Sequence, residues 1–182
     1  KILINFNKYI MNNNGARNFA LKIGKEEKAK WILPLDGNIF IPNSEYQKIK
    51  SDIRSNRFNY LLMPMARIHN YEEINNLNKL NFCEEPQIGF SYESDLTFNE
   101  NYVYGSRPKV ELLQKLQILD RWGSVNQMEP NHLEGFSIDS NNYFDYKYSG
   151  GSIRLPTLNK SNCFSPEQLM KKRSFNRDRA IY

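Results

Sequence analysis

The stretch WILPLDGNIF, residues 31–40, is the most informative part of the sequence for the fold. Its apolar run leads to Asp36, Gly37 follows, and apolar residues return at Ile39. Asp-Gly is common turn chemistry, which is compatible with a bend between two strand pieces. The other interpretation places Asp36 at the carboxyl end of a buried strand, where open α/β sheets collect ligands. Both predict a strand over 31–36, and Pro34 puts that strand near a sheet edge or at a break.

Helical and strand patterns alternate on both sides of this stretch. Apolar residues recur at helical spacing or form short runs that are typical of strands. This alternation predicts an α/β fold, a mixed sheet flanked by helices. We expect a helix over 16–29 that is capped by Asn13 or Asn14, and further helices over 43–55, over 109–119 and from 165 onward. We expect strands over 1–10, 58–68 (interrupted at Pro64) and 86–92. The segment 71–80 is expected to be a loop or short helix, and 141–156 a hairpin or loop.

Length and composition indicate one folded domain. The chain has 182 residues, 40% of them apolar, and it contains no apolar run long enough to span a membrane. Cys83 and Cys163 lie far apart and outside any paired metal or redox spacing, which favours a reducing, cytoplasmic location. The sequence begins at Lys1 rather than at a methionine, so we expect it to be a fragment.

The charge favours an anionic partner. The formal net charge is +5, and the basic residues are scattered except in KKRSFNRDR, residues 171–179. Phosphates, nucleotides and nucleic acids all suit such a chain. We expect no nucleic-acid partner, because no recognisable nucleic-acid-binding module accompanies the charge.

Asp36 gains interest from its neighbourhood. An Asp oxygen, with the Asn38 oxygen two residues on, suits a hard cation such as Mg²⁺ or Mn²⁺ that in turn holds a diphosphate. The segment NNNGARNFALKIGKEEKAKWILPLDGN, residues 12–38, resembles the central segment of the GT-A glycosyltransferases, especially the large inverting group called family 2. Those enzymes carry an Asn- and Gly-rich helix start with Ala-Arg-Asn, followed by an apolar strand that ends in an acidic motif.

A second segment is similar to the same family. FNENYVYGSRPKVELLQKL, residues 98–116, resembles the F-D-E-x-F-x-x-x-G-x-E-D-x-D-L-x-x-R-L segment of these enzymes. The order and spacing of the two segments also agree with the family. The matching positions are Phe98, Glu100, Gly105, Glu111, Leu112, Lys115 and Leu116.

The resemblance implies a GT-A-like catalytic domain that moves a sugar from a nucleotide-sugar donor to a saccharide or other hydroxyl acceptor, as hexosyltransferases do. It implies a divalent metal, Mn²⁺ or Mg²⁺, held by Asp36 and Asn38. Glu111 or Glu100 would serve as the general base. The residues expected to hold the donor are Arg17, Asn18, Asp36 and Arg154, the last of which would act from a flexible loop. Further phosphate contacts are expected from Arg173, Arg177 and Arg179. A flat surface for a sugar ring is expected from Tyr104 and Trp122.

Three departures from the family pattern qualify this interpretation. Pro108-Lys109 stands where the family has the Glu-Asp pair that supplies its base, and a lysine is ordinarily protonated. Asn38 replaces a second acid. The family's first strand and base-binding loop have no counterpart here, so we expect one partial GT-A domain over 1–182, truncated at its N-terminus, with 124–182 as an extension.

Two alternatives to an enzyme therefore stay open. The chain is compatible with a noncatalytic GT-A-like module that binds a saccharide or a nucleotide. A basic nucleic-acid-binding domain is the less favoured alternative.

Overall fold

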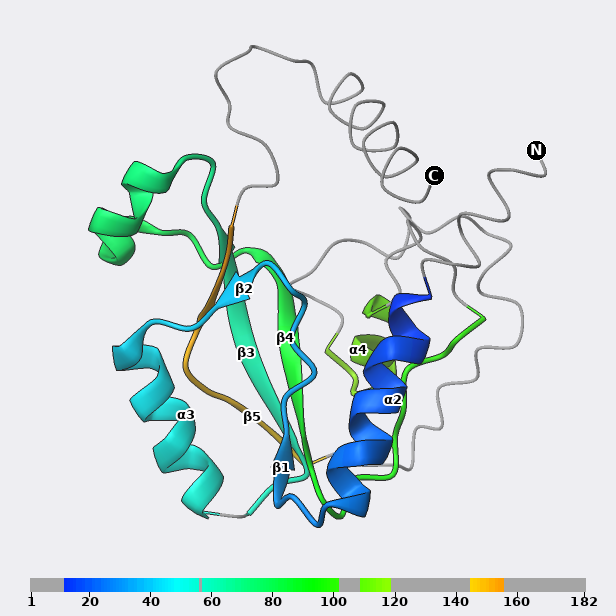
Figure 1. The fold of residues 1–182 in the computed structure, drawn as a ribbon. Helices are drawn as coiled ribbons and strands as arrows, with labels where there is room; N and C mark the ends of the chain where they lie inside the picture. Colours follow the sequence, from blue (N-terminus) through cyan, green and yellow to red (C-terminus); the bar gives the residue numbers. More distant parts are fainter. Residues whose placement is uncertain (1–11, 56, 102–108, 119–144, 156–182) are drawn as a thin grey trace, which may run out of the picture.

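A computed structural model describes residues 12–55, 57–101, 109–118 and 145–155. Within these residues the chain is a mixed α/β protein built on one curled, six-stranded mixed sheet (Figure 1), as the alternating pattern predicts. In chain order the elements are α2 (Asn13–Glu26), β1 (Trp31–Ile32), β2 (Ile39–Phe40), α3 (Asn43–Ser55), β3 (Tyr60–Arg67), the 3₁₀ segment η1 (Tyr71–Lys79), β4 (Glu84–Ser91), α4 (Val110–Lys115), β5 (Tyr146–Tyr148) and β6 (Ser152–Arg154).

Strand β3 is the centre of the sheet. The strand order is β1-β4-β3-β6-β2, and β5 also pairs with β3. Strand β4 runs antiparallel to β3, and their register shifts between Met63 and Met65. Pro64 therefore forms the predicted interruption, because proline has no N–H to give to the ladder.

The segment that contains β5 and β6 runs along β3 in the parallel sense. Strand β5 pairs with residues 60–62 and β6 with residues 65–67. The predicted hairpin or loop is thus wrong for residues 145–155, since each strand pairs with β3. A side chain at Gly150 would collide with the backbone of Glu45 in α3, so the break between the two strands needs a glycine.

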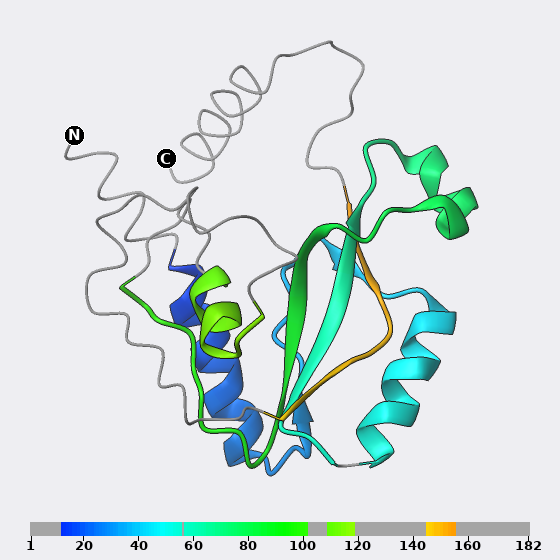
Figure 2. The same cartoon turned by 180° about the vertical axis from the view of Figure 1, so that it is seen from behind.

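Helices cover both faces of the sheet. Helices α2 and α4 lie on one face and α3 on the other, as Figures 1 and 2 show from opposite sides. Because side chains alternate along a strand, β3 serves both faces. Tyr60 and Leu62 join the core under α2 and α4, and Leu61 and Met63 join the core under α3.

Asp36 lies in the connection between the two edge strands. Strand β1 covers Trp31–Ile32, so the predicted strand over 31–36 ends early, before Pro34. Strand β2 pairs with β6 at the opposite edge. Because β1 lies at the Tyr60 end of β3 and β2 at the Arg67 end, residues 33–38 run from one end of the sheet to the other and carry Asp36.

The helices agree with the prediction except at their ends. The N-cap of α2 is Asn12, which accepts a hydrogen bond from the Gly15 N–H at 2.8 Å, so the prediction of Asn13 or Asn14 as the cap is wrong. Helix α3 covers the predicted residues 43–55. Helix α4 is shorter than predicted, and residues 110–114 are all buried.

Some predictions fall outside the described residues. They are the strand over 1–10, the helix from residue 165, Tyr104, Trp122, Arg173, Arg177 and Arg179. Among the helices that the structure describes, none is long and apolar enough to cross a membrane.

Candidate anion-binding site

Asp36 is held against helix α2 by Arg17. The Nη2 atom of Arg17 lies 2.5 Å from Oδ1 of Asp36, and the two side chains are 8% and 20% exposed. The Asp36 carbonyl also accepts a hydrogen bond from the Ile39 N–H at 3.0 Å, which closes a turn. Asp36 is therefore both a turn residue and an acid that faces a helix, so the two interpretations of this stretch are compatible.

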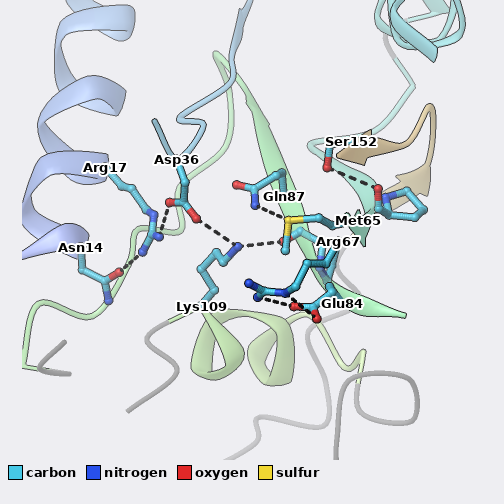
Figure 3. Close-up of polar contacts among 11 residues, drawn as sticks. Asn14, Arg17, Asp36, Met65, Arg67, Glu84, Gln87, Lys109 and Ser152 are labelled. Atoms are coloured by element: carbon cyan, nitrogen blue, oxygen red, sulfur yellow. Dashed lines mark hydrogen bonds and ion pairs between the residues drawn. The ribbon is translucent and has the colours of Figure 1, made fainter. Parts of the chain in front are cut away.

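Lys109 approaches the same carboxylate from helix α4. Its Nζ atom is 3.7 Å from Oδ2 of Asp36 and donates to the Pro86 carbonyl at 3.4 Å (Figure 3). The lysine side chain is 6% exposed. Sequence reasoning noted Lys109 only as a missing acid. No local pattern in the sequence shows that this lysine is buried, and a buried lysine requires a counter-ion, which Asp36 provides.

Two further contacts fix the guanidinium of Arg17. Asn14, one helical turn earlier, accepts a hydrogen bond from Nη1 at 2.8 Å, and the Phe98 ring centroid lies 5.3 Å from the guanidinium carbon. Asn14 is itself buried and donates to the Asn99 carbonyl at 2.7 Å. The Nε atom of Arg17 is buried without a hydrogen-bond partner.

Arg154 brings a third cation to this region from strand β6. The adjacent Leu155 exchanges two hydrogen bonds with Asn38: its N–H donates to the Asn38 carbonyl at 2.9 Å, and its carbonyl accepts from the Asn38 side chain at 3.4 Å. Arg154 is therefore anchored in a sheet, and the prediction that it acts from a flexible loop is wrong. Its Nε atom is also buried without a hydrogen-bond partner.

Arg17, Asp36 and Arg154 line a cavity of about 400 Å³. Helix α2 contributes one wall, the connection from Pro34 to Asn38 another, and β6 a third. The cavity is lined by Asn13, Ala16, Arg17, Ala20, Pro34, Leu35, Asp36, Gly37, Asn38 and Arg154. Four of the five residues expected to hold the donor or the metal, namely Arg17, Asp36, Asn38 and Arg154, line this single cavity.

The charges of the site are strongly coupled. Burial raises the pKa of Asp36, but the positive charges of Lys109 and Arg17 and the hydrogen bond from Arg17 outweigh it, so the pKa lies below its ordinary value. Burial lowers the pKa of Lys109 to about 8, although the negative charges of Asp36 and Glu85 oppose this. Asp36 is thus ionised at neutral pH, and Lys109 is largely protonated.

Asn18 does not line the cavity. Its side chain accepts from the Phe98 N–H at 2.9 Å and donates to the Phe98 carbonyl and to Oε1 of Glu100, both at 2.8 Å. These bonds fasten residues 98–100 to helix α2. Asn18 and Glu100 therefore contact each other, and neither of them lines the cavity at Asp36.

Glu111 is buried on helix α4. Its Oε1 atom lies 2.6 Å from Nζ of Lys115, and its Oε2 atom is buried without a hydrogen-bond partner. A solvated helix residue, the alternative to a base at this position, is excluded by its 3% exposure. No contact among the described residues joins Glu111 to Asp36, so its role as a base stays a prediction.

The residues present fit a metal ion poorly in this arrangement. Asp36 already has one carboxylate oxygen on Arg17 and the other facing Lys109, so both of its oxygens lie beside positive charges. A hard cation needs several oxygens that are free to coordinate it.

Comparisons with protein-family models, with curated proteins and with solved structures find no match to this chain.

Proposed function

We propose that this chain belongs to a nucleotide-sugar-dependent glycosyltransferase of the GT-A kind, and that the cavity at Asp36 takes the diphosphate of the donor. The observation that carries the proposal is the contact between Arg17 and Asp36. These residues come from two separate parts of the family-like segment, and they meet at a cavity. Arginine is well suited to such a role, because its planar fork of N–H groups matches phosphate oxygens.

The chemistry of sugar transfer agrees with this charge pattern. Negative charge gathers on the leaving diphosphate as the glycosidic bond breaks, and fixed cations at that position stabilise the transition state. Arg17 and Arg154 line the cavity and would contact the diphosphate. In the same proposal Glu111 or Glu100 accepts the proton of the acceptor hydroxyl.

The test is to bind nucleotide sugars to the chain and to measure transfer. A panel of uridine, guanosine and cytidine nucleotide sugars is titrated by calorimetry, and radiolabelled sugar in product is counted with a panel of saccharide acceptors. We expect binding that is lost in Arg17→Met and Asp36→Asn and kept in Arg67→Gln. Arg67 belongs to an ion pair with Glu84 on β3 and β4, so it is a matched control. Binding that is equal in all four proteins would contradict the proposal.

A noncatalytic relative is the second candidate. It is favoured by one observation, that Lys109 stands buried against Asp36 where the resemblance expects an acid. Such a module would bind nucleotide sugars or saccharides without transferring or hydrolysing them. The radiolabel assay separates the two, because only an enzyme would move the label into product.

The basic nucleic-acid-binding alternative makes a different demand. Its affinity for nucleic acid would fall steeply as salt is raised, because counterion release dominates such binding. It would also show no preference for nucleotide sugars over inorganic salts.

A further inference from the structure

We propose that the cavity at Asp36 binds the diphosphate of its ligand without a divalent cation, because Arg17 and Lys109 occupy the carboxylate that a metal ion would need. The inference rests on the proposed function, and it differs from the metal-assisted site that the resemblance implies. Arg17 and Arg154 are the residues assigned to contact the ligand. Lys109 is a positioning residue that holds Asp36 from behind the cavity.

The first argument is the occupancy of the carboxylate. Arg17 is 2.5 Å from one oxygen of Asp36, and Lys109 is 3.7 Å from the other. Both cations are almost completely buried. A divalent ion on Asp36 would lie beside both positive charges, and displacing either buried cation from the carboxylate would cost several kcal/mol.

The second argument is that Lys109 has little room to move aside. Its Nζ atom donates to the Pro86 carbonyl, and its side chain is 6% exposed. The whole first turn of α4 is buried as well, so the ammonium cannot turn to solvent while the helix stays in place. A metal ion in contact with Asp36 would then lie beside this positive charge and be repelled by it.

The third argument is the charge and donor inventory at the cavity. Arg17, Lys109 and Arg154 act on Asp36 as positive charges, so one carboxylate faces three cations. The other acid that acts on Lys109 is Glu85. Both Arg17 and Arg154 line the cavity and carry a buried Nε–H without a partner. An anion with several oxygens would balance these positive charges and offer acceptors to the two guanidinium groups.

A diphosphate fits this inventory better than a single carboxylate. It carries two adjacent phosphoryl groups, and it can accept hydrogen bonds from arginines on two walls of the cavity at once. Asp36 then sets the positions of the cations rather than those of a metal ion. Its turn with Ile39 and the Asn38–Leu155 pairing fix the loop that carries it.

The experiment titrates the full 182-residue chain with inorganic pyrophosphate by calorimetry. One series contains EDTA, and the other contains Mg²⁺ at a fixed excess. Pyrophosphate is the probe because it tests the diphosphate site without a nucleoside. We expect affinities that agree within about threefold between the two series, which is under 1 kcal/mol. When Mn²⁺ is added to the chain without pyrophosphate, electron paramagnetic resonance spectra should show the signal of free Mn²⁺ undiminished.

Three variants sharpen the test. Lys109→Gln should weaken binding in EDTA about tenfold or more, and Mg²⁺ should restore part of the loss, because the carboxylate then has a free oxygen. Lys109→Arg keeps the charge and should bind as the wild type does. A purely structural role of Lys109 would not change the response to Mg²⁺. Arg154→Gln changes a half-buried residue at the end of β6, and it should also weaken binding in EDTA.

The outcomes are distinguishable. Binding that is absent in EDTA and present with Mg²⁺ or Mn²⁺ would overturn this inference and leave the proposed function standing. Absence of binding in both series would overturn the proposed function as well. If Lys109→Gln fails to fold by circular dichroism, the comparison of EDTA with Mg²⁺ on the wild type and the Arg154→Gln variant still decides the question.

Discussion

Two arginine–carboxylate contacts among the described residues differ in burial and in charge balance. Arg67 on β3 meets Glu84 on β4 through two hydrogen bonds of 3.0 and 2.8 Å, one to each carboxylate oxygen. Arg17 meets one oxygen of Asp36, and the other oxygen faces Lys109. The first contact is a closed pair, in which one fork satisfies one carboxylate.

The difference separates a structural pair from a candidate site. The charges of Arg67 and Glu84 cancel, and both pKa values move toward the charged forms because of the hydrogen bonds between the two side chains. At Asp36 the cations exceed the acids, and donors remain unused on Arg17 and Arg154. Uncompensated positive charge beside a cavity is costly for the empty protein and is relieved by an anion.

The largest expected effect comes from neutralising the two carboxylates in turn. Asp36→Asn should lower the free energy of unfolding by about 3 kcal/mol, because it leaves two buried cations unpaired. Glu84→Gln should cost only about 1 kcal/mol, because Arg67 keeps partial contact with water. Urea denaturation at neutral pH measures both.

Because the pKa of Asp36 is lowered, the contribution of Asp36 to the free energy of unfolding is present above pH 3.8 and is lost as the pH falls below that value. Equal losses in the two variants would remove the distinction between the two contacts.

The next effect is the pH dependence that Lys109 gives to folding. Its pKa is about 8 in the folded protein and 10.5 ordinarily, so the unfolded chain holds more protons at this residue between those values. The cost of burying the charged lysine is fully present below pH 8 and disappears above 10.5. As the pH rises through this window, the free energy of unfolding of the wild type should therefore increase relative to that of Lys109→Met, by up to about 1.4 kcal/mol per pH unit.

Urea denaturation of both proteins at steps through the window measures this gain. Arg67→Met is the control, because arginine stays charged throughout. A wild-type minus Lys109→Met difference that does not vary with pH would show that Lys109 is not buried in its charged form.

A smaller effect is expected at Asn18, which matches a donor-binding position of the family but fastens residues 98–100 to helix α2. Asn18→Ala removes the bonds to Phe98 and Glu100 and should lower the free energy of unfolding by about 1–2 kcal/mol. Pyrophosphate affinity should stay within about twofold of the wild type, because Asn18 does not line the cavity. A loss of affinity without a loss of stability would restore Asn18 to the site.

The smallest effect is expected at Gly37, next to Asp36. A methyl group added there meets no atom within 4 Å, so Gly37→Ala should change the free energy of unfolding by no more than about 0.5 kcal/mol. Thermal unfolding by circular dichroism measures the change. A large loss would mean that the turn requires a glycine, and with it that Asp36 is placed by backbone conformation more than by Arg17.

The sequence predicts those parts of the fold that depend on local patterns. The helix at 43–55 and the strand broken at Pro64 appear as predicted, because capping, periodicity and proline chemistry act over a few residues. The pairing of β5 and β6 with β3 was not predictable in this way. This pairing joins Tyr60 to Tyr146, which lie far apart in the sequence. In addition, a Gly-Gly pair gives the same local signal in a hairpin as in a break between two strands.

The candidate site divides in the same way. The contact of Arg17 with Asp36 follows from motif order and is found in the structure. The burial of Lys109 could not be predicted, because its partner lies in a different segment and lysine is ordinarily exposed. Asn18 matched the motif, yet its side chain faces residues 98–100 instead of the cavity.

The position of β6 between β3 and β2 also has a consequence for the order of folding. Strand β2, which follows the Asp36 turn, has β6 as its neighbour, and β6 is more than a hundred residues farther along the chain. During synthesis this edge stays open until Ser152–Arg154 leaves the ribosome, and contacts of such long separation form slowly. The same late event brings Arg154 to its place, so the nascent chain acquires a finished sheet and a complete set of cations together.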